Sequence, residues 1–169
     1  MDVRKRLLTI FSVSFACVGI DQATKLLASE YLTKNAMVSY FNDILRVGFV
    51  ENIGAFLGLG NSMSEQARFW LFVLLVGAFL LGLLCYLLSN NKLNLPSLLA
   101  LSLIFSGGIS NFHDRVFNHG AVIDFLNIGV GSLRTGIFNV ADIAIMIGVF
   151  MIIIVQGKKD SSALLTTNK

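Results

Sequence analysis

The run from Phe69 to Leu88 restricts the fold of this chain more than any other feature, because it contains no charged residue. A helix of about 20 predominantly apolar residues is long enough to cross the roughly 30 Å hydrocarbon core of a bilayer. This run therefore predicts a membrane-spanning helix. Three other apolar stretches have a similar length, and we expect four spans, at about residues 7–25, 69–88, 95–113 and 138–156.

The charge content of the whole sequence agrees with a membrane protein. Charged residues make up 14% of the 169 residues, and hydrophobic residues make up 55%. A soluble domain carries about 25% charged residues. Because the sequence has a single proline and no internal repeat, we expect one integral-membrane domain over residues 1–169.

The positions of the basic residues predict the orientation of the spans. Cytoplasmic loops of membrane proteins carry an excess of Lys and Arg. We therefore expect both termini, and the connection between the second and third spans, to be cytoplasmic. Segments 29–66 and 115–137 are then external. The basic residues that give this orientation are Arg4, Lys5, Arg6, Lys92, Lys158 and Lys159.

The external segments contain short runs that are typical of β-strands. Met37–Phe41 and Ile44–Val50 are rich in β-branched and aromatic residues, and Asn42-Asp43 separates them, which indicates a hairpin. Ala121–Val130 has a similar composition. Because lipid does not tolerate open sheet edges, these strands must lie outside the hydrocarbon or against protein. The predicted fold class is an all-α membrane protein, with four transmembrane helices and a small extracytoplasmic β-sheet.

Polar residues gather where the predicted spans meet the external segments. In the predicted topology they all fall near the outer face of the membrane. Ionisable groups at membrane depth are costly, so they indicate a functional site by default. The residues concerned are Asp21, Asn52, Asn111, Asp114, Arg115, Asp124, Asn139 and Asp142.

Two of these acids, Asp124 and Asp142, suit acid–base chemistry. Two carboxylates held close together in a low-dielectric site cannot both ionise easily, so they share a proton. One can then act as a general base on water while the other donates a proton to a carbonyl oxygen. Asp124 belongs to an external strand-like segment and Asp142 to the start of a helix, so the fold must bring them together.

Both acids also have a structural interpretation. Asn139 suits a helix N-cap, and Asp142, three residues later, would complement the helix dipole in the first turn. Taken alone, Asp142 fits capping better than catalysis. Asp124 fits a solvated loop acid equally well.

The remaining polar residues leave similar alternatives open. Asp21 and Lys25 share one helix face, either as an ion pair that reaches the membrane surface or as part of a site. Asp114 and Arg115 predict an internal ion pair. Asn52 by itself would be a turn residue.

Other chemistries lack support in the sequence. His113 and His119 do not form the H-E-x-x-H pattern of zinc proteases, and there is no G-x-S-x-G, phosphate loop or dinucleotide fingerprint. Cys17 and Cys85 lie inside apolar runs and are predicted to be packing residues. No basic patch is interleaved with aromatic residues, so we expect no nucleic-acid partner.

Five short blocks of sequence together resemble the bacterial lipoprotein signal peptidase family (signal peptidase II). They occur in the order that the family shows, and the length and the four predicted spans agree. The blocks are Asp21-Gln22-Ala23-Thr24-Lys25, Asn52-Ile53-Gly54-Ala55, Gly107-Gly108-Ile109-Ser110-Asn111-Phe112-His113-Asp114-Arg115, Val122-Ile123-Asp124-Phe125 and Phe138-Asn139-Val140-Ala141-Asp142.

The resemblance implies an intramembrane aspartyl endopeptidase of the bacterial cytoplasmic membrane. Such an enzyme removes the signal peptide from diacylglyceryl-modified prolipoproteins and cuts before the lipidated cysteine. By motif match, Asp124 and Asp142 would be the catalytic pair. The residues that would shape the site, hold substrate or support the pair are Asn52, Gly54, Asn111, Asp114, Arg115, Asn139, Asp21 and Lys25.

The resemblance also implies the partners of the site. No metal or organic cofactor is expected, and globomycin-type inhibitors would occupy the substrate site. The sheet and the Asp124 segment would form a cradle and lid over a lipidated substrate, in a monomer surrounded by membrane lipids. The chain departs from the family pattern in places: Ser110 replaces a usual Gly, and His113 replaces an aliphatic residue. Phe56 comes one position early, and Leu57-Gly58 replaces the usual small polar residue.

Two other classes of protein remain as alternatives. A small transporter or proton-conducting protein would need polar groups along the whole membrane depth. We expect the inner halves of the second, third and fourth predicted spans to be bare, which disfavours such a path. A non-catalytic scaffold would tolerate Asp124→Asn, whereas a peptidase would not.

Overall fold

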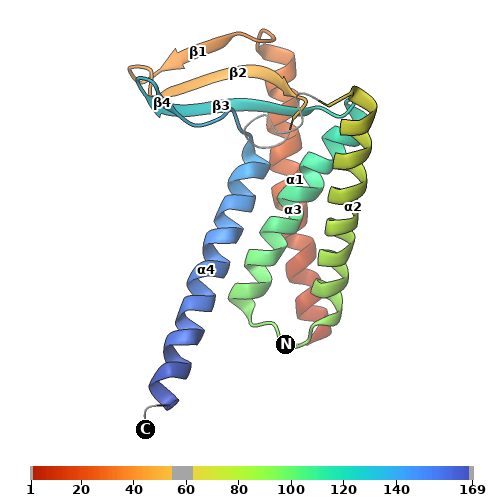
Figure 1. The fold of residues 1–169 in the computed structure, drawn as a ribbon, viewed down its shortest axis with the longest axis vertical. Helices are drawn as coiled ribbons and strands as arrows, with labels where there is room; N and C mark the ends of the chain where they lie inside the picture. The colour runs from red at the N-terminus through yellow and green to blue at the C-terminus, as the bar shows by residue number, and fades with distance from the viewer. Residues whose placement is uncertain (1, 55–62, 168–169) are drawn as a thin grey trace.

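A bundle of four long helices carries a small antiparallel sheet across one end (Figure 1). The computed structural model describes residues 2–54 and 63–167. Helix α1 begins, and helix α4 ends, at the end of the bundle away from the sheet. The elements in chain order are α1 (Val3–Tyr31), β1 (Met37–Tyr40), β2 (Leu45–Asn52), α2 (Glu65–Ser89), α3 (Leu95–Phe117), β3 (Val122–Val130), β4 (Leu133–Arg134) and α4 (Val140–Thr167).

All four helices are long and apolar enough to cross a membrane, which confirms the predicted fold class. The spanning segments are Val3–Tyr31, Phe69–Ser89, Leu95–Phe117 and Val140–Gly157. Helix α1 therefore extends beyond the predicted span at both ends, and α3 continues past residue 113. Both helices run through charged residues that the sequence had marked as ends, and of these Lys25 and Asp114 are buried in a contact described below. Residues 158–167, beyond the predicted fourth span, continue α4.

The sheet confirms the three predicted strands and adds a short fourth. Its order is β1-β2-β3-β4, with every neighbouring pair antiparallel. The predicted hairpin turn is present between β1 and β2, where Phe41, Asn42 and Asp43 all have positive φ. Asp43 stabilises this turn by accepting two hydrogen bonds from the Arg46 guanidinium, at 2.7 and 2.6 Å.

Small residues allow helices α3 and α4 to pack closely. A Cβ atom added at Gly107 would lie 2.4 Å from the carbonyl oxygen of Ala141, and one added at Gly148 would lie 2.6 Å from that of Ala100. Backbones can approach this closely in a membrane only where side chains are small. This packing places the middle of α3 directly against the first turn of α4.

The opposite end of the bundle is held by a buried arginine. Arg6 is 5% exposed and donates hydrogen bonds to Asn91 and to the carbonyl oxygen of Leu88. It therefore binds the C-terminal end of α2, where helix carbonyls lack partners within the helix. One of the charges that predicted the orientation is thus also a contact between helices.

Candidate active site

Asp124 lies where the sheet meets the helices, and its carboxylate is enclosed by amide groups. The residue is on β3 and is 2% exposed. Asn139 Nδ2 donates to Asp124 Oδ1 at 2.6 Å, and Asn52 Nδ2 donates to Asp124 Oδ2 at 2.9 Å. The alternative interpretation of Asp124 as a solvated loop acid is therefore wrong: this carboxylate is buried, and its hydrogen-bond donors are neutral.

Asp142 occupies the first turn of α4 and makes the capping contacts expected there. The backbone N–H of Asn139 donates to Asp142 Oδ2 at 3.1 Å, and the N–H of Asp142 donates to Asn139 Oδ1 at 3.0 Å. Such a reciprocal pair satisfies two N–H groups at a helix start. The other oxygen, Asp142 Oδ1, accepts from Asn111 Nδ2 at 2.9 Å. The capping contact at Oδ2 therefore sets the orientation of the Asp142 carboxylate, with Oδ1 directed toward Asn111.

Two asparagine side chains connect the two acids. Asn139 Nδ2, which donates to Asp124, also lies 3.1 Å from Asn111 Oδ1, and Asn111 donates to Asp142. The chain of contacts runs from Asp124 through Asn139 and Asn111 to Asp142. The fold thus links residues of β3, α3 and α4 in one polar cluster at the sheet end of the bundle.

The environment of Asp124 favours its protonated form. Burial raises the pKa of the Asp124 carboxyl to about 7, although the hydrogen bonds from Asn52 and Asn139 act in the opposite direction. The nearby charge of Asp142 raises this pKa further. A carboxyl with a pKa near neutrality can both donate and accept a proton at physiological pH.

A buried lysine organises the layer beneath this cluster. Lys25 is 1% exposed, and its ammonium lies 2.7 Å from Asp21 Oδ2 and 2.7 Å from Asp114 Oδ2. It also donates to Asn111 Oδ1 at 2.8 Å. The interpretation of Asp21 and Lys25 as a pair that reaches the membrane surface is therefore wrong.

The contact between Lys25 and Asn111 determines which way the amide of Asn111 points. An ammonium has three N–H donors and no acceptor, so it must face the amide oxygen. The amide nitrogen of Asn111 is then directed toward Asp142. The buried cation thus positions a donor for the acid above it.

The predicted ion pair between Asp114 and Arg115 does not form. Consecutive residues on a helix point in different directions. Asp114 contacts Lys25, whereas Arg115 donates to the carbonyl oxygen of Gly54 at 3.2 Å and lies 5.4 Å from the centre of the Phe72 ring. Among the described residues, the buried Nε of Arg115 has no hydrogen-bond partner.

Asn52 and Gly54 combine a turn with the site. The N–H of Gly54 donates to Asn52 Oδ1 at 3.1 Å, which is the contact of an Asx turn. The same side chain donates to Asp124 from its nitrogen. The two interpretations of Asn52 are therefore compatible. Phe56, the early aromatic residue, lies outside the described residues.

Two residues of the buried network were given no role by the sequence. Ser110 is fully buried and donates to Asp21 Oδ2 at 2.7 Å, and Gln22 Nε2 lies 2.8 Å from Asp114 Oδ1 and 3.0 Å from Ser110 Oγ. The other oxygen of Asp21 accepts from the N–H of Ala141 at 2.8 Å. The only sequence signal for Ser110 was that it replaces a usual glycine. Its hydroxyl donates to Asp21, the α1 residue that also binds the first turn of α4.

We expect Ser110→Ala to lower stability, because Asp21 would remain buried with one hydrogen-bond donor fewer. A hydrogen bond to a charged group contributes about 1.5–3 kcal/mol. The thermal unfolding midpoint in detergent should fall clearly below that of the wild type. Ser29→Ala is the matched control, since Ser29 is exposed and only donates to the carbonyl oxygen of Leu26. An unchanged midpoint for Ser110→Ala would show that the hydroxyl is dispensable.

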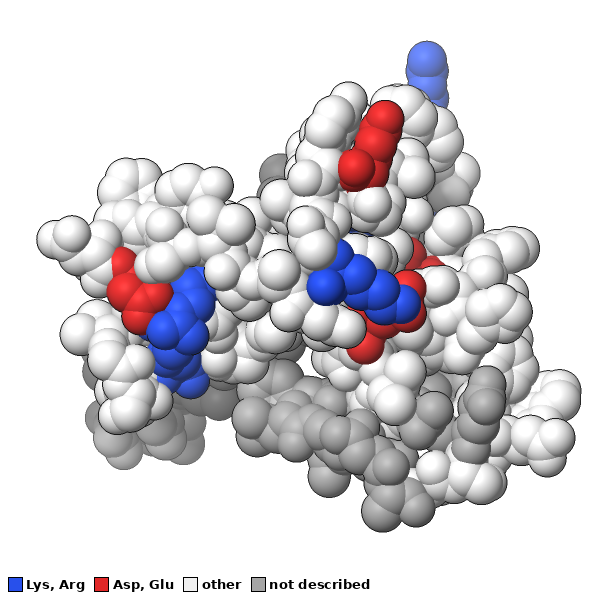
Figure 2. Space-filling model, turned by 90° about the horizontal axis from the view of Figure 1, so that it is seen from above, with Lys and Arg blue, Asp and Glu red and all other residues white. Residues whose placement is uncertain are grey.

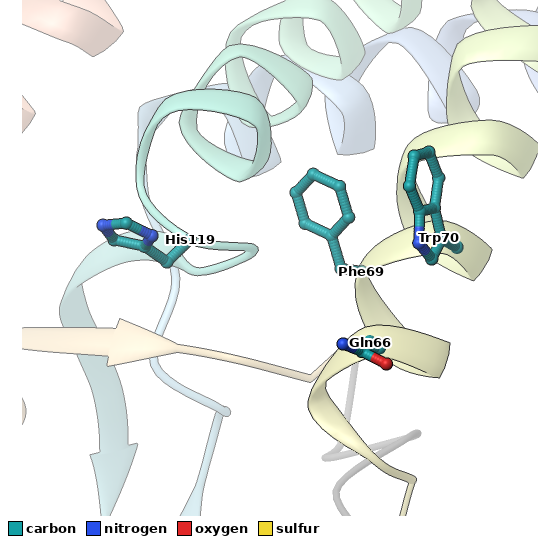
Figure 3. A pocket seen from close by; sticks show the side chains of 4 residues that line it. All are labelled: Gln66, Phe69, Trp70 and His119. Carbon is teal, nitrogen blue, oxygen red and sulfur yellow. The ribbon is translucent and has the colours of Figure 1, made fainter.

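A separate hollow lies beside the first turns of α2 (Figure 3). Its lining residues are Gln66, Phe69, Trp70 and His119, the last of which comes from the loop after α3. None of the four belongs to the cluster around Asp124 and Asp142. The other histidine, His113, is exposed on α3 and packs on Phe117 with ring centres 4.7 Å apart. We assign no chemistry to this hollow or to His113.

Comparisons with known proteins agree on one family. The sequence model described as signal peptidase (SPase) II matches residues 13–157. The lipoprotein signal peptidase of Treponema denticola is 31% identical over 166 residues, which cover 94% of this chain and 96% of that protein. That of Borrelia hermsii is 32% identical over 156 residues, which cover 89% and 91%.

Solved structures show the same architecture. One described as a bacterial membrane enzyme, determined by the in meso method, superposes with a TM-score of 0.79 at 28% identity, and the match covers 91% of this chain and 90% of that one. A second with a similar description gives a TM-score of 0.74 at 26% identity, with 88% and 92% covered. The similarity therefore includes both the helices and the sheet.

Proposed function

We propose that this chain, which belongs to the lipoprotein signal peptidase (signal peptidase II) family, is an intramembrane aspartyl endopeptidase. It would remove the signal peptide from diacylglyceryl-modified prolipoproteins and cut before the lipidated cysteine. It would work in the bacterial cytoplasmic membrane, with both termini in the cytoplasm and the site near the outer face. The observation that carries the proposal is the linkage of Asp124 and Asp142 through Asn139 and Asn111.

The catalytic step needs one proton on the pair of acids. The ionised carboxylate accepts a proton from a water molecule as the water oxygen attacks the scissile carbonyl carbon. The protonated carboxyl donates its proton to the carbonyl oxygen, which gives a neutral tetrahedral diol. Because its pKa is raised to about 7, Asp124 suits the protonated partner and Asp142 the base.

The second step restores the pair. The carboxyl that took the proton from water returns it to the amide nitrogen, so that the carbon–nitrogen bond breaks and the amine leaves. The other carboxylate takes back a hydroxyl proton of the diol as the new carboxyl group forms. The pair again holds one proton, and no covalent link to the enzyme forms. The neutral amides of Asn52, Asn111 and Asn139 would keep both carboxyls in position throughout.

Arg115 is suited to hold the substrate backbone. Its guanidinium binds the carbonyl oxygen of Gly54 at the end of β2, and its Nε has no partner among the described residues. A buried donor without a partner is costly, so a substrate carbonyl that binds there would gain a strong hydrogen bond. We propose that Arg115 and Gly54 position the peptide beside Asp124.

A proton-conducting protein remains poorly supported. Such a protein would need polar groups along the whole membrane depth, and a proton relay needs ionisable ones among them. The third span is not bare, because Ser102 and Ser106 are buried on α3 below Ser110. These hydroxyls are not ionisable groups, and among the described residues the next buried charge is Arg6 at the far end. The buried charges are thus concentrated at the sheet end.

The direct test uses purified wild-type protein in detergent with a diacylated precursor and with the same precursor lacking the lipid. We expect a product that begins at the lipidated cysteine, identified by its intact mass, and little cleavage of the unlipidated form. Equal cleavage of both precursors would contradict the proposed substrate class. A cut at any other bond would contradict the proposed position of the substrate.

We expect kcat/KM for cleavage to fall as the pH rises above about 7, because the pair then loses its remaining proton at Asp124. The same raised pKa affects stability in the same direction. The folded state binds this proton more tightly than the unfolded chain, so the stabilisation is complete below about pH 4 and is lost as the pH rises through about 7. A rate that stays constant from pH 6 to pH 9 would be inconsistent with a required proton on Asp124.

A further inference from the structure

The basic side chains at the two ends of the bundle have different partners. Figure 2, which views the molecule from the sheet end, shows acidic and basic side chains lying together there. Four of the cations at this end form ion pairs with acids of the same chain: Lys25, Lys34, Arg46 and Arg134. Their charges are therefore largely neutralised within the protein.

At the other end of the bundle, three exposed cations have no acid of the chain as a partner. Arg4 and Lys5 lie in the first turn of α1, and Lys92 lies in the turn between α2 and α3. None of the three forms an ion pair in the part of the chain that the structure describes. Asp2 is the one acid at this end whose side chain is described, and it is exposed. We call Arg4, Lys5 and Lys92 the basic collar, and it carries an excess of positive charge.

A buried cation connects the two parts of the collar. Arg6 donates hydrogen bonds to Asn91 and to the carbonyl oxygen of Leu88, so the start of α1 lies against the turn that carries Lys92 (Figure 1). Arg6 is 5% exposed, and both of these acceptors are neutral. A buried charge without an opposite charge is costly. An anion held by the neighbouring collar would lower this cost.

The side chains next to the collar place it at a membrane surface. Val3, Leu7 and Leu8 are exposed apolar residues of the same membrane-spanning helix. In a bilayer these side chains face lipid, and long basic side chains at the end of such a helix reach the headgroups. The anions at this level are the phosphates of phospholipids. Clusters of Lys and Arg beside a spanning helix are suited to lipids whose headgroup has a net negative charge.

We propose that the basic collar binds anionic phospholipids through their headgroup phosphates, in the leaflet at the end of the bundle where α1 begins. Each cation near an anionic lipid surface raises the affinity about fivefold. The bound lipid contacts both the start of α1 and the turn between α2 and α3, so it reinforces the contact that Arg6 makes. The proposal does not depend on the proposed reaction, because no residue of the collar belongs to the cluster around Asp124 and Asp142.

The test is a lipid titration of the purified full-length protein in a neutral detergent, with bound lipid measured by native mass spectrometry. Phosphatidylglycerol and phosphatidylcholine with the same acyl chains are added in separate experiments, without substrate. We expect the wild type to bind phosphatidylglycerol more tightly, by about fivefold or more. Lys92→Gln should reduce this preference about fivefold, and the combined variant Arg4→Gln/Lys5→Gln/Lys92→Gln should remove most of it.

Lys34→Gln is the matched control, because it removes the same charge from another exposed lysine. Lys34 lies at the sheet end and is paired with Glu51, so this variant should keep the wild-type preference. Lys92→Arg keeps the charge and should keep the preference as well. The thermal unfolding midpoint of each variant is measured without lipid, so that a folding defect is recognised. If the combined variant does not fold, Lys92→Gln still tests the proposal, since it changes one exposed residue in a turn.

Three results would overturn the proposal. The first is equal binding of the two lipids by the wild type. The second is a preference that survives in the folded combined variant, or in Lys92→Gln where that variant does not fold, because the anionic lipid would then bind elsewhere. The third is displacement of phosphatidylglycerol by an equal concentration of glycerol 3-phosphate, because the collar would then recognise a soluble phosphate and not a lipid.

Discussion

Asp124→Asn and Asp142→Asn should each abolish cleavage of a diacylated precursor. Asparagine keeps the shape of the side chain but can neither take a proton from water nor give one to the substrate carbonyl. Acid–base groups of this kind contribute about 10²–10⁴-fold to the rate, and with one of the two lost we expect a reduction of about 10³-fold or more. The measurement is the rate of signal-peptide release by purified protein in detergent, with intact mass as the readout.

The matched control for this prediction is Asp2→Asn. Asp2 is exposed at the start of α1, at the far end of the bundle, and its side chain makes no capping hydrogen bond. This control should keep the wild-type rate, and all three variants should elute from a sizing column as the wild type does. If either site variant still cleaves at a rate close to that of the wild type, that residue is not part of the catalytic pair.

Lys25→Met should cause the largest loss of stability. It would leave Asp21 and Asp114 buried next to each other without the cation that now lies 2.7 Å from both. Removing one partner of a buried ion pair costs about 3–5 kcal/mol. We expect a strong fall in the thermal unfolding midpoint or a failure to accumulate in membranes. Cleavage should fall as well, because Asn111 would lose the contact that orients it.

Lys34→Met provides the control, with the same chemical change at an ion pair of the same length. Lys34 and Glu51 are also 2.7 Å apart, but the Lys34 side chain is 53% exposed. Exposed pairs contribute little, so this variant should unfold close to the wild-type temperature. Adding Asp114→Asn to Lys25→Met should restore part of the lost stability. If Lys25→Met behaves like Lys34→Met, the buried cation does not hold the site together.

The spans and strands could be predicted because their signals are local. An uncharged run such as Phe69–Leu88 predicts a span directly. The β-branched and aromatic residues of Met37–Phe41 and Ile44–Val50, separated by Asn42-Asp43, predict a hairpin. The ends of α1 and α3 could not be predicted in this way. Charged residues normally end a span, whereas here α1 and α3 continue past Lys25 and Asp114, which are buried against each other although they are far apart in the sequence.

The same distinction applies to the site. Asp142 three residues after Asn139 predicts the helix cap, which is a local contact. The contact of Asp124 with Asn139 depends on how β3 packs against the start of α4, and no local pattern specifies it. The family resemblance identified both acids, but it did not indicate that Asp114 would pair with Lys25 and not with Arg115. Ser110 was visible only as a departure from the family pattern.

The central claim is that Asp124 and Asp142 act as a pair that holds one proton near neutral pH. Carbon-13 NMR of protein labelled at the aspartate carboxyls, recorded from pH 4 to pH 9, measures this without any substrate. We predict one carboxyl that titrates near pH 7, that is absent in Asp124→Asn, and that titrates at a lower pH in Asp142→Asn because the neighbouring charge is gone. If no aspartate of the wild type titrates above pH 5, or if the signal near pH 7 survives in Asp124→Asn, the claim is wrong.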